Sequence, residues 1–362
     1  MKVEMRNVAI LGAGGTGHAL AADLTLSGLD AILYEEPEFK EKLIPIRRSG
    51  YIGLTGALGE HKIDFNKTTT DIREALQDAD IILVAVNALR HARIAEQCLS
   101  HLKDGQIMVI GPDNGGTLLI SAMFREYGLK ADIRIAGLGG GFYPCRMAGP
   151  AKVVIGLPKG PKRIAAFPGN QTKEVITGLN RLQDALQFTA GTNVLEMVLS
   201  SPNIPNHLAG SLLNAGAVEQ SGGEFYLYKQ GLTPAVLKCI SSVADERRSL
   251  FDALGYSISS NDFLQKCARQ NEFPALDTFR GLIGPTDLQH RYVTEESHTG
   301  LALMVSLAEM IKVPVPVTKA LLTLASAING TNYLSEGRTV QKLGLSGLSV
   351  DEINRFLAEG DK

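Results

Sequence analysis

Short apolar runs and longer helix-forming stretches alternate along the first half of the chain. The run NVAIL, residues 7–11, is apolar and β-branched and predicts a short buried strand. Residues 18–28 carry helix formers with leucines on one face, and Gly28 ends the pattern. The run DAILYEE, residues 30–36, then predicts a second strand that ends on acidic residues. The chain therefore begins as strand, helix, strand.

The alternation continues beyond these three elements. The runs DADIILVAVNAL and GQIMVIGP predict buried strands, and HARIAEQCLSHL and GGTLLISAMFREYG predict the helices that follow them. Two more strands are expected from ADIRIAGLGGGFYPCR and KVVIGLPK. Strands that alternate with helices favour a parallel sheet with helices on both faces. We expect an α/β protein that begins with a doubly wound, Rossmann-type domain.

The pattern changes near residue 185 and is helical almost throughout the rest of the chain. Apolar residues recur at spacings of three and four in four stretches, residues 205–219, 233–254, 297–312 and 316–328. A βα section followed by a helical section argues for two domains. We expect a Rossmann-type domain at residues 1–185 and an all-α domain at residues 186–362. The second domain would supply the residues that carry out chemistry on the ligand of the first.

Composition narrows the classes of partner. The chain has 362 residues, with 36 Lys and Arg against 38 Asp and Glu, so its formal net charge of −2 favours no nucleic acid. The sequence shows no signal region and no apolar run long enough to cross a bilayer, so we expect a soluble, cytoplasmic protein without a membrane partner. Its four cysteines are scattered, which gives no support to a metal site. A homodimer through the helical half is compatible with the sequence.

The glycines between the first strand and the first helix suggest a ligand. The stretch VAILGAGGTGHALAADL places Gly12 at a tight turn, Gly14 and Gly15 where a pyrophosphate could approach, and Gly17 against the strand. Glu35 ends the second strand, where it would take the ribose hydroxyls and repel a 2′-phosphate. The sequence thus predicts NAD (NADH), with NADP disfavoured; the alternative is a βαβ turn without a ligand.

Two further turns are expected at the carboxyl ends of parallel strands, where such sheets bind ligands. Asn87 follows one strand, and the GPDNGG turn at residues 111–116 follows the next. We count Asn87 among the cofactor-binding candidates. Ordinary turn chemistry explains both positions equally well.

A polar stripe on a helix of the second half offers candidate chemistry. If Pro205 lies in the first turn of that helix, then His207, Ser211 and Asn214 share one face, while the other face is Leu and Ala. Histidine suits proton transfer at neutral pH. The alternative is a structural histidine whose ring is hydrogen-bonded to the backbone.

Acidic residues precede another predicted helix. Glu295 and Glu296 lie just before a helix expected to begin near Ser297, where the helix dipole would favour ionised carboxylates. One of them paired with His207 would fix the tautomer of the imidazole; the alternative is that both only cap the helix. Arg291 is a candidate clamp for a substrate carboxylate, or else part of a surface ion pair.

Several long motifs, in order and nearly from end to end, resemble those of the opine dehydrogenase family, the octopine and nopaline dehydrogenase group that includes the bacterial carboxyethyl-norvaline dehydrogenase. The matching motifs are GAGGTGHALAA, NIPNHLAGSLLNA, GLTPAV with a following DERR, FRGLIGP, RYVTEESHTGL and EGRTVQKLGLSGLS. The resemblance implies reductive condensation, in which an α-keto acid and the amino group of an amino acid form an imine that NADH reduces.

The resemblance also implies roles for individual residues. His207 matches the family's general acid/base and Arg291 matches its carboxylate-binding arginine. The resemblance also places Asn203, Asn214 and Cys145, the last in GLGGGFYPCR, among the substrate-binding residues. Glu296 stands where the family has aspartate, and its extra methylene changes the reach. Leu208 replaces the proline that usually follows the histidine.

A larger departure lies in GLGGGFYPCR, where glycines at residues 139–141 replace a Glu-Thr pair of octopine dehydrogenase-like members. This indicates a bulkier or differently held substrate, or a pocket that no longer turns over an opine. Two alternatives therefore stay open. One is a 2-hydroxy acid or ketopantoate-type reductase, although no lysine is placed to act as its general acid. The other is an NAD-binding sensor without activity, against which the paired base and clamp count.

Overall fold

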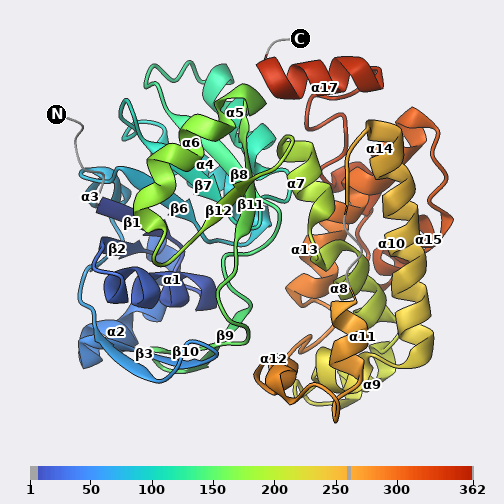
Figure 1. Ribbon diagram of the computed structural model, residues 1–362, viewed down its shortest axis with the longest axis horizontal. Helices are drawn as coiled ribbons and strands as arrows, with labels where there is room; N and C mark the ends of the chain where they lie inside the picture. The colour runs from blue at the N-terminus through green and yellow to red at the C-terminus, as the bar shows by residue number, and fades with distance from the viewer. Residues whose placement is uncertain (1–6, 259–261, 361–362) are drawn as a thin grey trace. The chain divides into compact units, whose positions relative to one another are not determined.

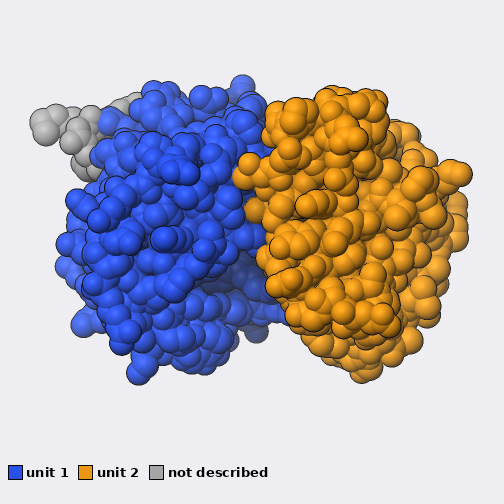
Figure 2. All heavy atoms as spheres, turned by 90° about the horizontal axis from the view of Figure 1, so that it is seen from below, with its two compact units in different colours: residues 1–197, 358–360 blue, residues 198–357, 361–362 orange. Residues whose placement is uncertain are grey.

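A computed structural model describes residues 7–258 and 262–360 of the chain. The chain forms two compact units, coloured separately in Figure 2: unit 1 contains residues 7–197 with Ala358–Gly360, and unit 2 contains residues 198–357. Of the helices in the described ranges, none is long and apolar enough to cross a membrane.

Unit 1 is built on an eight-stranded sheet with the order β12-β11-β8-β7-β6-β1-β2-β5. The strands from β8 to β5 pair in parallel, and β11 runs antiparallel to β8. This mixed sheet with its helices confirms the expected Rossmann-type fold. The strands are β1 (Asn7–Leu11), β2 (Asp30–Tyr34), β5 (Thr68–Thr69), β6 (Ile81–Val84), β7 (Ile107–Ile110), β8 (Arg134–Leu138), β11 (Lys162–Phe167) and β12 (Phe188–Ala190).

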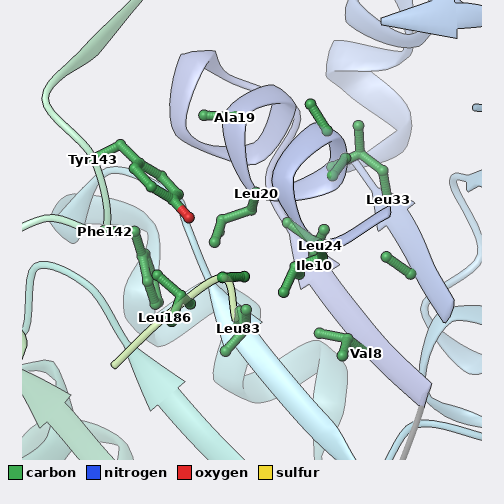
Figure 3. Close-up of a cluster of buried hydrophobic side chains, with 14 of the residues drawn as sticks. Val8, Ile10, Ala19, Leu20, Leu24, Leu33, Leu83, Phe142, Tyr143 and Leu186 are labelled. Carbon is green, nitrogen blue, oxygen red and sulfur yellow. The ribbon is translucent and has the colours of Figure 1, made fainter. Parts of the chain in front are cut away.

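Helices cover both faces of this sheet (Figure 1). Because side chains alternate across a strand, Val8 and Ile10 of β1 join one apolar core and Leu11 joins the other. Figure 3 shows the first core, in which Leu20 and Leu24 of helix α1 pack toward β1. The helices and helical turns of unit 1 are α1 (Gly15–Leu26), η1 (Pro37–Leu43), α2 (Ile44–Ser49), α3 (Ile72–Leu76), η2 (Ala88–Arg90), α4 (His91–Cys98), α5 (Gly116–Glu126), η3 (Gly169–Gln171), α6 (Thr172–Leu179), η4 (Asn180–Leu182) and α7 (Val194–Ser200), of which α7 continues into unit 2.

A second, four-stranded sheet in unit 1 was not expected from the sequence. Its order is β4-β3-β10-β9, formed by β3 (Tyr51–Gly56), β4 (His61–Asp64), β9 (Cys145–Gly149) and β10 (Lys152–Ile155). The run KVVIGLPK does form a strand, but as β10 it pairs with β3 and β9 and not with the main sheet. The pairing of β10 with β3 joins segments far apart in the sequence, which periodicity cannot reveal.

The chain leaves unit 1 later than the sequence pattern indicated. We expected the boundary at residue 185, but unit 1 extends to Met197. The extension follows from β12, which pairs in parallel with β11 at the edge of the main sheet. Only three residues long, β12 is too short for an alternating pattern to stand out.

Unit 2 is helical, as expected. In its described part, strand pairing is limited to one isolated bridge between Tyr226 and Gly284. The helices have ordinary end signals: Thr233 precedes α10 and its hydroxyl accepts from the Val236 N–H, and Gly255, with a φ of 74°, follows the last residue of the helix. The elements are α8 (Asn203–Leu212), α9 (Ala215–Gln220), η5 (Leu227–Gly231), α10 (Pro234–Leu254), α11 (Phe263–Ala268), η6 (Pro274–Leu276), α12 (Asp277–Arg280), α13 (Arg291–Glu296), η7 (Ser297–Leu301), α14 (Ala302–Ile311), α15 (Pro316–Asn329), α16 (Tyr333–Glu336) and α17 (Val350–Glu359).

Two expected helices differ from the prediction. The helix expected at residues 205–219 is interrupted between Leu212 and Ala215, so α8 and α9 are separate. The helical segment expected to begin near Ser297 begins at Arg291, because the ring nitrogen Nδ1 of His290 accepts the Tyr292 N–H and caps α13. Histidine is not one of the preferred N-cap residues, so this start carried no recognisable signal.

Candidate active site

The glycine turn between β1 and α1 is fixed by two close approaches. Gly12 has a φ of 113°, and a Cβ there would lie 2.8 Å from the Val86 side chain. A Cβ on Gly17 would lie 1.8 Å from the Gly12 carbonyl oxygen. These two positions admit no other residue without displacing backbone.

The start of α1 fits an anionic ligand. Gly14 is the N-cap, and outside its chain neighbours and its own helix no described atom lies within 4 Å of a Cβ built on it. The first turn of α1 begins at Gly15 and carries no acidic residue. Open space in front of unsatisfied N–H groups at a helix N-terminus suits a pyrophosphate. The residues present thus fit the expected dinucleotide.

Glu35 occupies the expected place at the end of β2, where its carboxylate is buried among donors. It is 1% exposed and accepts from the Ala13 N–H at 3.0 Å, Lys42 at 3.1 Å and Arg90 at 2.7 Å. Burial raises the pKa of Glu35, but hydrogen bonding to Arg90 and the charge of Lys42 together lower the pKa by more than burial raises it. The net shift is therefore downward. The residues after Glu35 contain no arginine, yet η2 supplies one from elsewhere in the chain. A contact between Glu35 and a ribose stays a prediction.

The other cofactor candidates make local capping contacts. The Asn87 side chain accepts the Leu89 N–H at 2.9 Å and caps η2. In the turn after β7, Asp113 accepts from both the backbone N–H and the hydroxyl of Thr117, at 2.8 and 2.5 Å. These contacts are the turn chemistry that the sequence allowed. A role for Asn87 toward the cofactor stays a prediction.

Cys145 lies in unit 1, at the start of β9. It is buried, and its Sγ is 3.9 Å from the Thr16 hydroxyl of α1, next to the glycine turn. The glycine run at residues 139–141 follows β8, and Gly140 has a φ of 158°. Cys145 therefore contacts the first turn of α1, and its role toward a substrate stays a prediction.

In unit 2, His207 is held on three sides. It projects from α8 and is 3% exposed; its Nδ1 lies 2.8 Å from Oε1 of Glu296, and its Nε2 lies 3.1 Å from the hydroxyl of Tyr228. Its ring stacks on Tyr292, with 3.6 Å between centroids and 14° between planes. A histidine bound to a carboxylate through one nitrogen has its orientation fixed and can exchange protons through the other.

The two adjacent glutamates have different partners. Glu296 pairs with His207, whereas Glu295 lies 3.7 Å from the guanidinium of Arg291, one helical turn earlier. Both residues lie inside α13 and not ahead of a helix N-terminus. The expectation that a helix dipole stabilises their ionised carboxylates is therefore wrong. Burial raises the pKa of Glu296 to about 7, against the opposing effects of Arg291 and the Asn203 side chain. The His207–Glu296 pair can therefore take up or release a proton near neutral pH.

The three remaining unit 2 candidates surround this pair in different ways. The Arg291 side chain is 39% exposed and lies over the Tyr292 ring at 5.3 Å, so its fork can reach a carboxylate outside the protein. The side chain of Asn203, at the start of α8, hydrogen-bonds to Glu296 and lowers the pKa of its carboxyl. Asn214 donates to the carbonyls of Gly210, at 2.8 Å, and Gly231, at 3.1 Å. That last contact is structural, and substrate binding by these residues stays a prediction.

Sequence reasoning missed the two tyrosines that contact His207. Tyr292 is adjacent to the predicted Arg291 and could have been suspected from that position. Tyr228 belongs to the π-helical segment η5, which shows no helical or strand periodicity. Its spacing from His207 therefore carried no signal.

Comparisons with known proteins agree along nearly the whole chain. Residues 190–329 match the family described as NAD/NADP octopine/nopaline dehydrogenase, alpha-helical domain, and residues 8–116 match ketopantoate reductase PanE/ApbA. The opine dehydrogenase of Arthrobacter sp. (strain 1C) is 31% identical, over 96% of this chain and 98% of its own length. The vitopine synthase of Allorhizobium ampelinum is 23% identical, over 97% and 99%.

Solved structures agree on the fold. Octopine dehydrogenase with NADH and L-arginine superposes with a TM-score of 0.71 at 18% identity, covering 98% of both chains. The same enzyme with NADH and pyruvate gives a TM-score of 0.69. A PanE/ApbA family ketopantoate reductase from Ralstonia eutropha gives 0.60 at 18% identity, covering 90% of this chain.

Proposed function

The chain belongs to the opine dehydrogenase family, and we propose that it joins an α-keto acid to the amino group of an amino acid by NADH-dependent reductive condensation. The single observation that best supports this reaction is the buried His207–Glu296 pair beside the accessible Arg291. A pair that exchanges protons, beside an arginine that can bind a carboxylate, suits this reaction. Each of the two substrates carries a carboxylate, and protons are exchanged as they condense. Structures of a related octopine dehydrogenase contain NADH together with L-arginine, an amino acid, or with pyruvate, an α-keto acid.

In this proposal His207 moves the proton of the condensation step. Neutral His207 takes a proton from the substrate ammonium, so that the free amine can attack the carbonyl carbon and form the C–N bond. Within the adduct a proton moves from nitrogen to oxygen to give a hydroxyl. The imidazolium then returns its proton to that hydroxyl as the C–O bond breaks, which releases water and leaves a protonated imine. Glu296 accepts the Nδ1–H of His207 and stabilises the imidazolium while it exists.

Arg291 would orient a substrate through one of its carboxylates. The guanidinium presents a planar fork of donors that matches both oxygens of a carboxylate. Its partner Glu295 holds the side chain at 3.7 Å, a distance that leaves the fork able to take a second, closer carboxylate. Arg291 therefore fixes the substrate, and His207 acts on its amine and carbonyl.

Unit 1 would hold the cofactor. When bound, NADH supplies the hydride that reduces the imine to the secondary amine of the product. The N–H groups at the start of α1 would hold the pyrophosphate, with Gly14 leaving room for its approach. NADH is the cofactor present in the related octopine dehydrogenase structures.

The first test is NADH oxidation by the purified protein with a panel of α-keto acids, each with and without a panel of amino acids. Oxidation that requires both partners is the expected result and identifies the substrates together. Oxidation with a keto acid alone would instead indicate direct carbonyl reduction, as in the ketopantoate reductases that residues 8–116 resemble. Tight NADH binding with no turnover would favour a sensor.

Two expectations about the whole protein remain part of this proposal. We place the reaction in the cytoplasm, because reductive synthesis draws on the NADH pool there. The homodimer stays a prediction, which light scattering coupled to size-exclusion chromatography would check directly.

A further inference from the structure

The hydroxyl of Tyr228 lies 3.1 Å from Nε2 of His207, the nitrogen that does not face Glu296. Tyr228 is 6% exposed and belongs to η5. The steps given above for His207 do not use this hydroxyl.

The printed contacts of His207 make its Nε2, on the Tyr228 side, a route for its protons. Nδ1 is held by Glu296 at 2.8 Å, one ring face stacks on Tyr292, and the side chain is 3% exposed. An imidazole in this setting exchanges protons through Nε2. The Tyr228 hydroxyl contacts Nε2 at 3.1 Å, and a hydroxyl can accept one proton while it donates another.

Tyr228 also lies within electrostatic range of the proposed carboxylate clamp. Desolvation lowers the pKa of Arg291, but Glu295 raises it, with further contributions from Tyr292, Glu296 and Tyr228. The hydroxyl therefore contacts the His207 ring and contributes to the electrostatic surroundings of the guanidinium that would hold the substrate.

The position of Tyr228 is fixed by contacts within unit 2. Its ring packs against Phe279 with 4.4 Å between centroids. The Asn214 amide donates to Gly210 of α8 and to Gly231 of η5, and so ties the segment carrying Tyr228 to the helix carrying His207. A hydrogen bond supported in this way keeps its geometry while protons move.

We propose that Tyr228 is a catalytic residue that carries protons between His207 and the substrate. This inference rests on the proposed reductive condensation. In the first step the substrate ammonium gives a proton to the Tyr228 oxygen as the Tyr228 hydroxyl proton passes to Nε2. In the second step the hydroxyl proton passes to the departing oxygen of the adduct, and Nε2–H replaces it, so Tyr228 and His207 end as they began.

The test is Tyr228→Phe, which removes the hydroxyl and keeps the ring. We expect kcat to fall about 10²-fold or more, as for loss of a proton-transfer group, with KM for NADH within about twofold. The first step needs an unprotonated Nε2 and therefore a His207–Glu296 pair that has lost its titratable proton, so wild-type kcat should rise as pH rises through the titration of that pair. In Tyr228→Phe the residual kcat should be nearly independent of pH over the same interval.

Tyr256→Phe is the matched control, because Tyr256 is also in unit 2, is also 6% exposed and also loses a hydroxyl hydrogen bond, to Asn354 at 2.8 Å. We expect it to keep the wild-type kcat and pH profile. A Tyr228→Phe variant with wild-type kcat would overturn the relay and leave the condensation reaction standing. A slower variant that keeps the wild-type pH profile would also overturn it and give Tyr228 a structural role. If none of the substrate pairs supported NADH oxidation by the wild-type protein, the proposed function would be refuted, and the relay with it.

Discussion

His207 and Glu296 form a pair in which burial opposes the charged carboxylate, while Arg291 and Asn203 support it. Glu296 is fully buried and His207 is 3% exposed, so neither group is well solvated. The consequence is a carboxyl pKa of about 7, far from its ordinary value. A group that titrates near the working pH is suited to proton exchange, which is why the pair is the centre of the proposed mechanism.

Replacing His207 with alanine should therefore remove proton transfer and leave cofactor binding intact. We expect kcat to fall about 10²-fold or more, with the Kd for NADH unchanged, because the cofactor site belongs to unit 1. Steady-state kinetics and NADH fluorescence titration measure the two quantities. Wild-type turnover in His207→Ala would exclude the residue from the mechanism.

The raised pKa of Glu296 also predicts a pH dependence of stability. Between pH 4.5 and about pH 7, Glu296 keeps its proton in the folded state but has lost it in the unfolded chain. This carboxyl group therefore makes the free energy of unfolding fall as pH rises. Glu296→Gln cannot ionise and should lack that contribution, so its stability relative to wild type should increase from pH 5 to pH 8. Urea unfolding at several pH values measures this, and parallel profiles for the two proteins would contradict it.

At this scale the sequence was informative where one residue type carries the chemistry. His207, Glu296 and Arg291 could be singled out because histidine, carboxylates and arginine have few alternatives for proton transfer and carboxylate binding. Tyr228 could not, because a tyrosine in an aperiodic segment is indistinguishable from a core aromatic until its partner is known. Which glutamate pairs with His207 was likewise decided by the register of α13.

At the scale of elements, the turn from β1 into α1 separates two kinds of glycine. Gly17 is required by packing against the Gly12 carbonyl, whereas Gly14 faces open space. Gly17→Ala should destabilise the protein by about 1–3 kcal/mol, as overpacking does. Gly14→Ala should keep the wild-type Tm but weaken NADH binding about tenfold, or about 1.4 kcal/mol. Thermal unfolding and NADH titration of both variants test this; a Gly14→Ala variant with wild-type affinity would place the pyrophosphate elsewhere.

The glycine turn was predictable because its constraints are local, within one strand-turn-helix unit. The second sheet was not, because Gly53 of β3 pairs with Lys152 of β10 across a long stretch of chain. The start of α13 was missed for a different reason, since the capping group is the His290 ring and not a side chain of the usual capping type. Element type followed from periodicity, while partners and ends depended on contacts that periodicity does not encode.

For the whole molecule, the proposal assigns separate tasks to the two units: unit 1 binds NADH and unit 2 carries the proton chemistry. Variants in different units should then act independently. We expect the losses in kcat/KM for NADH caused by Gly14→Ala and His207→Ala, expressed as free energies, to add within about 0.5 kcal/mol in the double variant. The control is the pair His207→Ala and Glu296→Gln, two residues in direct contact, whose losses should be strongly non-additive. Non-additivity of the first pair as large as that of the second would mean that cofactor binding and proton transfer are one coupled process, and the division of labour between the units would have to be given up.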